Sequence, residues 1–200
     1  MFWNTNIDNK IEKVDLRKSP VIITVNKFNE ESTKKFRTDI NMAANSGQKV
    51  IPIVIDSYGG QVYSLMSMVS MIKSCPLPVA TIIQGKAMSC GIALASFGTE
   101  GMRYMDPDAT VMIHEVSSSS WGKNEELQAS ADETARLNEK ILTMMSRNCG
   151  HSDDYFSKLI HEKGHADWFL DAKEVLKHNI VSHLKIPVLE INITAEIDIK

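Results

Sequence analysis

Ser89 is the first residue of this 200-residue chain whose surroundings suggest acyl-transfer chemistry. It lies in the small-residue segment 85–91, where a predicted strand enters and a predicted helix leaves. A hydroxyl at such a corner is close to a helix N-terminus, whose dipole and free N–H groups stabilise developing negative charge. The corner is similar to a nucleophile elbow, although Ala87 stands where the G-x-S-x-G pattern has glycine. On this segment alone, a structural N-cap is the favoured interpretation of Ser89.

The segment 56–60 places two glycines at the end of another predicted strand. Paired glycines let backbone N–H groups point into a cleft, and ligand sites in open α/β sheets gather at these strand ends. The N–H groups of Gly60 and Cys90 are therefore candidates for an oxyanion hole. Losing one such donor typically costs about 3–4 kcal/mol in the transition state. A plain turn explains the segment at least as well when it is considered alone.

A histidine and an aspartate complete the candidate set. His114 ends an apolar strand, and an ordinary pKa of about 6.5 suits a general base. A buried structural histidine explains that position equally well. Asp167 precedes bulky apolar residues, where a carboxylate can hold an imidazole in the right tautomer. Asp171 competes for this role, but it forms a predicted capping box with Glu174, which leaves Asp167 for chemistry.

The elements that must position these residues alternate in the first half of the chain. Apolar strand-like runs and helical patterns follow one another, which favours an α/β fold with parallel strands and right-handed crossovers. The uninterrupted apolar runs are typical of strands covered on both faces. Pro52 lies inside one run, where proline disrupts a ladder, so an irregularity is predicted there. Strands are predicted at 20–25, 50–55, 79–83, 102–105 and 110–113.

A long helical pattern over 122–147 changes the character of the second half. It is too long and too polar on one side for an internal core helix. It is either a surface helix packed on the sheet or a projecting helix that packs against another subunit. The stretch from His183 onward is predicted to add an edge strand. The other histidines lie in helical or loop contexts and are predicted to be on the surface; they are His151, His161, His165, His178 and His183.

Composition limits the functional classes. A chain with 43% hydrophobic and 24% charged residues is ordinary for a soluble globular protein. The net charge of -3 gives no preference for nucleic acid or an anionic membrane. The N-terminus lacks the basic and apolar parts of a signal peptide, and the apolar runs are strand length. Three cysteines without metal-ligand spacing favour a reducing cytoplasm, and neither a metal nor a cofactor is expected.

Four segments together resemble the motifs of the Clp protease proteolytic subunit, ClpP. Residues 56–60 resemble its N-S-P-G-G loop, and residues 88–91 resemble its A-S-M-G nucleophile segment. Residues 111–114 match its V-M-I-H motif, and residues 167–175 resemble its D-R-F-L-S-A-x-E-A segment. The motifs occur in the family's order between about residues 20 and 182, which makes the resemblance specific.

The resemblance implies a crotonase-like β/α superhelical fold with a handle helix at about 122–148. The implied organisation is an N-terminal arm over 1–19, a peptidase domain over 20–182 and a tail over 183–200. It implies a serine endopeptidase that cleaves peptides and unfolded proteins inside two stacked heptameric rings, with an AAA+ unfoldase as a possible partner. The implied roles are nucleophile, base and orienting acid for Ser89, His114 and Asp167, oxyanion hole for Gly60 and Cys90, and substrate binding for Gly59 and Gly60.

Several positions depart from the family pattern. Cys90 stands where the family usually has methionine, a change expected to matter little because the backbone N–H is the functional group. The N-terminal arm lacks the D-x-Y-S-R-L-L stretch, a departure that bears on docking to an AAA+ unfoldase. The tail from about Lys185 to Lys200 is also untypical of the family, which suggests a divergent or viral member. Three alternatives remain open at this point: an inactive assembly subunit, a crotonase-fold acyl-CoA enzyme, and a peptidase with a Ser–Lys dyad, for which Lys86 is the nearby lysine.

Overall fold

The computed structural model describes residues 20–164 and 167–190, so the predicted N-terminal arm, His165 and the last ten residues of the tail lie outside the described part. A seven-stranded sheet runs through it, with five strands in the order β1-β2-β3-β4-β7, all parallel. β5 pairs parallel with β3, and β6 pairs antiparallel with β5. The strands are β1 Ile23–Val25, β2 Ile51–Ser57, β3 Val79–Met88, β4 Arg103–Met105, β5 Thr110–Ile113, β6 Trp168–Leu170 and β7 His183–Leu184.

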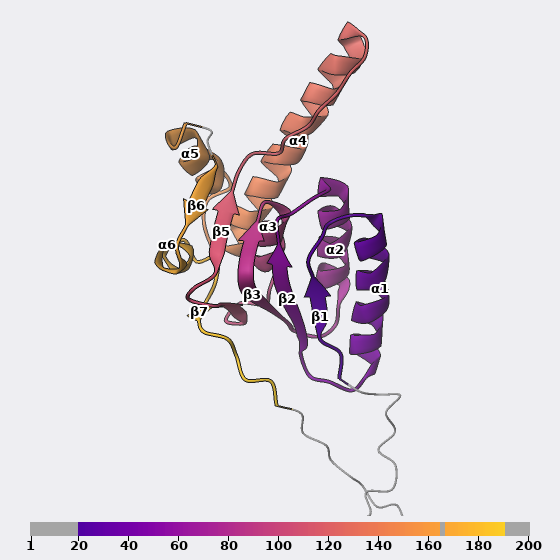
Figure 1. Ribbon diagram of the computed structural model, residues 1–200, viewed down its shortest axis with the longest axis vertical. Helices are drawn as coiled ribbons and strands as arrows, with labels where there is room; N and C mark the ends of the chain where they lie inside the picture. The colour runs from indigo at the N-terminus through magenta and orange to yellow at the C-terminus, as the bar shows by residue number, and fades with distance from the viewer. Residues whose placement is uncertain (1–19, 165–166, 191–200) are drawn as a thin grey trace, which may run out of the picture.

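Six helices in the described residues accompany this sheet. α1 and α2 pack side by side beside β1 and β2, whereas α5 and α6 lie beyond β5 with β6 (Figure 1). The predicted α/β fold with parallel strands is therefore confirmed, and β7 confirms the predicted edge strand at His183. β6 is a strand that the sequence analysis did not anticipate. The helices are α1 Glu30–Asn45, α2 Val62–Ser74, α3 Cys90–Ala95, α4 Asn124–Asn148, α5 Tyr155–Glu162 and α6 Ala172–Lys177.

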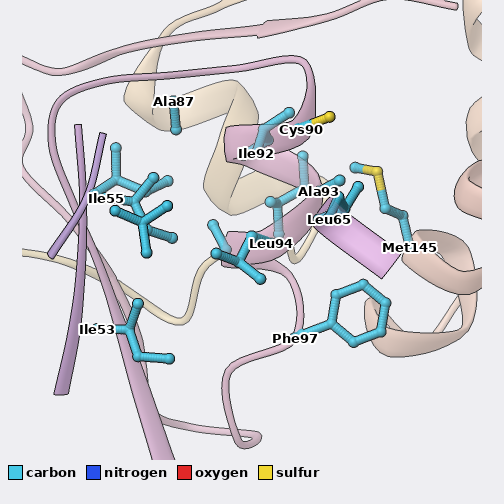
Figure 2. Close-up of a cluster of buried hydrophobic side chains, with 14 of the residues drawn as sticks. Ile53, Ile55, Leu65, Ala87, Cys90, Ile92, Ala93, Leu94, Phe97 and Met145 are labelled. Atoms are coloured by element: carbon cyan, nitrogen blue, oxygen red, sulfur yellow. The ribbon is translucent and has the colours of Figure 1, made fainter. Parts of the chain in front are cut away.

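The core is centred on the short helix α3, all six residues of which are buried. Its aliphatic side chains lie between Ile53 and Ile55 of β2 on one side and Met145 of α4 on the other (Figure 2). A helix that is apolar all round is stable only when neighbours cover every side of it. The corner that precedes α3 is therefore anchored to a helix that is buried on every side.

β3 changes its neighbour halfway along its length. Residues 81–83 pair with β4, and residues 86–88 pair with β5. The register with β2 shifts between these halves, and Gly85 there has a φ of +74° that favours glycine. The prediction of an irregularity at Pro52 is wrong, because Pro52 pairs in regular register with Ala80 of β3. The ladder between β2 and β1 begins only at Ile53, so the N–H that proline lacks is not needed on that side.

α4 extends well beyond the sheet (Figure 1). Its buried residues all lie from Leu137 onward, and none lies between residues 124 and 136. This confirms a projecting helix, and Leu127 within its projecting half is exposed. The segment after β5 runs outward along α4 to the point where the helix begins (Figure 1), and the Val116 N–H donates to Asn138 Oδ1 at 3.0 Å. In the described residues, none of the helices is both long and apolar enough to span a bilayer.

Candidate active site

Ser89 occupies a strained corner between β3 and α3. Its backbone has φ 55° and ψ −120°, a region that costs a non-glycine residue about 1–3 kcal/mol. Ser89 is at the N-cap position of α3, but its side chain makes no capping hydrogen bond. The structure therefore gives no support to the simple N-cap interpretation. It instead matches the sharp strand-to-helix turn on which hydrolases expose a nucleophilic hydroxyl.

Two close contacts hold this corner against neighbouring segments. The Ser89 N–H donates to the Met112 carbonyl at 2.9 Å, which ties the corner to β5 two residues before His114. Gly59 lies so near that a Cβ at this position would be 2.7 Å from Ser89 Cβ. Gly59 therefore has to be glycine both for this approach and for its φ of +102°.

One small pocket brings together four of the predicted residues. Its volume is about 60 Å³, and Ser89, His114, Gly60 and Cys90 all line it. The remaining wall is almost entirely aliphatic, so charges that develop at the mouth of the pocket interact in surroundings of low polarity. The apolar wall residues are Val62, Leu65, Ile92, Ala93, Ile113, Val116, Ile141, Leu142 and Met145, with Ser117 beside them.

Asp167 reaches the neighbourhood of His114 through strand pairing. β6 is antiparallel to β5 with Trp168 opposite Ile113, so the next step of the register puts Asp167 opposite His114. Side chains at such opposed positions lie on one face of the sheet, with Cβ atoms about 4.5–5.5 Å apart. Asp167 is exposed and does not line the pocket. The described residues show no hydrogen bond from His114 to Ser89 or Asp167, and catalytic hydrogen bonds often tighten only with substrate bound.

Asp171 has the structural role predicted for it. Its carboxylate accepts a hydrogen bond from the Glu174 N–H at 2.8 Å, and Glu174 Oε2 accepts one from the Asp171 N–H at 3.3 Å. This reciprocal pair is the capping box of α6. Because its side chain is engaged at the start of α6, Asp171 is the weaker candidate for orienting His114.

His178 is a residue that the sequence analysis misplaced on the surface. It is only 6% exposed, its Nδ1 lies 2.8 Å from the Tyr155 hydroxyl, and its ring packs edge-on against Trp168 of β6. Burial lowers the pKa of His178. The misplacement arose because His178 follows a short helix with as many charged as apolar residues, so no local pattern indicates that Tyr155 and Trp168 pack against it. This cluster packs against β6, the strand that directly follows Asp167.

Lys86 does not suit the Ser–Lys dyad. Its ammonium lies 2.7 Å from Asp56 Oδ1 and 4.4 Å from the centre of the Tyr58 ring. The hydrogen bond to Asp56 is the main reason that the pKa of Lys86 is raised. A lysine with a raised pKa stays protonated at neutral pH and cannot remove the proton of a serine.

The Lys86→Ala variant should therefore keep the peptide hydrolysis that the resemblance implies within about threefold of wild type, because an exposed ion pair contributes only about 0–1 kcal/mol. Steady-state hydrolysis of a fluorogenic peptide measures this directly. The sharpest comparison uses Asp56→Ala as a second variant, which frees Lys86 without removing it. A loss of several decades in Lys86→Ala alone would revive the dyad.

The described residues contain no group of three or more His, Cys, Asp or Glu side chains arranged to hold a metal ion. The three cysteines are free thiols, and two of them, Cys90 and Cys149, are buried. What the site offers is a hydroxyl on a strained corner, an imidazole in the same pocket and a carboxylate opposite the imidazole. Those groups are the ones that acyl transfer through a covalent intermediate requires.

Comparison with known proteins identifies a family of proteases for this chain. The family model described as Clp protease matches residues 7–185. The chain is 29% identical over 143 residues to the ATP-dependent Clp protease proteolytic subunit of Streptococcus mutans, covering 70% of this chain and 71% of that protein. It is 28% identical over 140 residues to the subunit of Streptococcus uberis, covering 69% of each, and 28% identical over 137 residues to that of Deinococcus radiodurans, covering 68% and 65%.

Proposed function

Because this chain belongs to the Clp protease family, we propose that it is a serine endopeptidase that cleaves peptides and unfolded proteins through Ser89, His114 and Asp167. The observation that carries the proposal is the shared pocket, in which Ser89 on its strained corner lies with His114, Gly60 and Cys90. An acyl-CoA enzyme of the crotonase fold needs the backbone donors but has no use for a strained serine beside a histidine.

In the proposed mechanism, Ser89 Oγ attacks the carbonyl carbon of the scissile peptide bond while His114 takes its proton. The carbonyl oxygen becomes an oxyanion, which receives hydrogen bonds from the N–H groups of Gly60 and Cys90. His114 then gives the proton to the leaving amine, and the C–N bond breaks to leave an acyl-enzyme on Ser89. A water molecule repeats the sequence, with His114 as base, and releases the carboxylate product.

Asp167 acts in this mechanism through His114. Its place opposite His114 in the continued β5–β6 register supports a role in fixing the orientation and tautomer of the imidazole. The carboxylate also stabilises the imidazolium that forms in each half of the reaction. The peptide substrate lies extended beside Gly59 and Gly60, and the aliphatic wall of the pocket suits an apolar side chain next to the scissile bond.

The proposed assembly is a double ring of heptamers in the cytoplasm, to which an AAA+ unfoldase can deliver substrates. The projecting half of α4 supports this assembly. None of its residues over 124–136 is buried, so apolar side chains such as Leu127 are exposed and available for contact with another subunit. A self-complementary contact between such helices closes a symmetric particle. Active sites inside such a chamber are open to short peptides and closed to folded proteins.

Short fluorogenic peptides should accordingly be cleaved readily, whereas a folded fluorescent protein should persist for many times longer without an unfoldase. The same protein in a permanently unfolded form serves as the control, because it differs only in its ability to thread through a narrow entrance. The measurement is loss of intact protein on a gel over time. Rapid unaided cleavage of the folded form would argue against a closed chamber.

A further inference from the structure

The loop that carries the Gly60 N–H is held at three consecutive residues. The Gly59 N–H donates to Ser57 Oγ at 3.0 Å, the Cys90 thiol donates to the Gly60 carbonyl at 3.3 Å, and the Gln61 N–H donates to the Phe28 carbonyl at 2.8 Å. Two adjacent glycines lose more conformational entropy on ordering than any other pair of residues. These contacts therefore decide how well one predicted oxyanion donor is fixed.

Ser57 uses both hydrogen-bonding functions of its hydroxyl. It is completely buried, donates to the Asn26 carbonyl at 3.0 Å and accepts from the Gly59 N–H. The hydroxyl thus connects the loop after β1 with the double-glycine loop after β2. Removing it leaves the Asn26 carbonyl and the Gly59 N–H without this partner, and a polar group that loses its hydrogen-bond partner costs free energy.

Cys90, the first residue of α3, holds the same double-glycine loop through the hydrogen bond from its thiol to the Gly60 carbonyl. It is 4% exposed and shares the pocket with Ser89 and His114. Burial raises the pKa of the Cys90 thiol, while the Gly60 backbone and the Ser89 hydroxyl act in the opposite direction. The thiol stays protonated at neutral pH, so it remains an S–H donor and does not compete with Ser89 as a nucleophile.

We propose that Ser57 and Cys90 are positioning residues that clamp the Gly59–Gly60 loop, so that the N–H groups of Gly60 and Cys90 face one oxyanion. Cys90 is then doubly involved, since its backbone supplies one donor and its side chain restrains the residue that supplies the other. Methionine, the usual family residue here, has no S–H and cannot make this contact. The Cys90 side chain therefore matters more than the sequence analysis expected. This inference rests on the proposed peptidase function.

The test compares kcat and KM for peptide hydrolysis by four variants. Two of them remove a side chain of the clamp, and two remove a similar side chain elsewhere. Because outright loss of an oxyanion donor lowers kcat by about 10²–10³-fold, loosening it in Ser57→Ala or Cys90→Ala should lower kcat by roughly tenfold with KM near wild type. Ser96→Ala and Cys149→Ala are the matched controls. They remove a buried hydroxyl and a buried thiol of similar exposure outside the clamp and should leave kcat unchanged.

Cys90→Ser provides the rescue, because a hydroxyl keeps the donor and should restore kcat to within about threefold of wild type. Hydrogen exchange of the peptide that spans residues 57–65 gives a second readout that does not depend on activity. Exchange should quicken in Cys90→Ala and stay slow in Cys90→Ser. Equal kcat and equal exchange in Cys90→Ala and wild type would overturn the clamp. A wild type that cleaves no peptide, with the exchange difference intact, would overturn the peptidase function alone.

Discussion

Ser89→Ala should abolish peptide hydrolysis, with kcat lower by about 10⁴–10⁶-fold, because triad members act as a unit and the remaining groups cannot form an acyl-enzyme. The fold should survive the change. The Ser89 side chain makes no capping hydrogen bond, and alanine meets the same backbone strain at φ 55° as serine does. The measurement is single-turnover and steady-state hydrolysis of a fluorogenic peptide, with thermal unfolding recorded on the same samples.

Ser96→Ala is the matched control for this variant. Ser96 is a serine of the same short helix region whose buried hydroxyl bonds to the Ala93 carbonyl at 2.7 Å, outside the pocket. Its loss should lower the free energy of unfolding without lowering kcat. Activity of Ser89→Ala within tenfold of wild type would place the nucleophile elsewhere.

The second large effect concerns the acid. Asp167→Asn should lower kcat by about 10²–10⁴-fold, because an amide keeps the shape of the carboxylate but favours the wrong imidazole tautomer. Asp171→Asn should leave kcat nearly unchanged, because asparagine is as good an N-cap as aspartate for α6. Both variants should be compared on one peptide across pH 6 to 9.

Whichever of the two variants loses more kcat identifies the aspartate that orients His114. A greater loss in Asp171→Asn would move the orienting acid to Asp171, whose carboxylate the structure engages with the Glu174 N–H. Equal and small losses would mean that His114 works without a carboxylate partner. His178 offers a further comparison, since His178→Phe should disturb the support of β6 and affect Asp167 only indirectly.

Local patterns carried most of the fold prediction. Apolar runs of β-branched residues identify β1, β2, β3 and β5 because such residues fit a sheet covered on both faces. The capping box at Asp171 was also predictable, because all of its atoms lie within four consecutive residues. Ser89 and His114 could be proposed because each lies at the end of a strand that the sequence itself outlines.

Contacts between distant segments were out of reach. The Cys90 thiol meets a carbonyl 30 residues away, and no spacing rule links a buried thiol to a glycine loop. The strand β6 is three residues long and gains its identity from pairing with β5, so its sequence alone gave no signal. The burial of His178 depends likewise on Tyr155 and Trp168, which reach it from α5 and β6.

The most direct test of the central claim is labelling with a fluorophosphonate, read by intact mass on wild type and on Ser89→Ala. Native mass spectrometry of the same samples gives the size of the particle. We expect one adduct per wild-type chain, none on Ser89→Ala, and a closed symmetric particle of about fourteen subunits in both. An adduct that persists in Ser89→Ala, or a well-formed wild-type ring that takes no adduct, would contradict the assignment of Ser89 as the nucleophile of a serine peptidase.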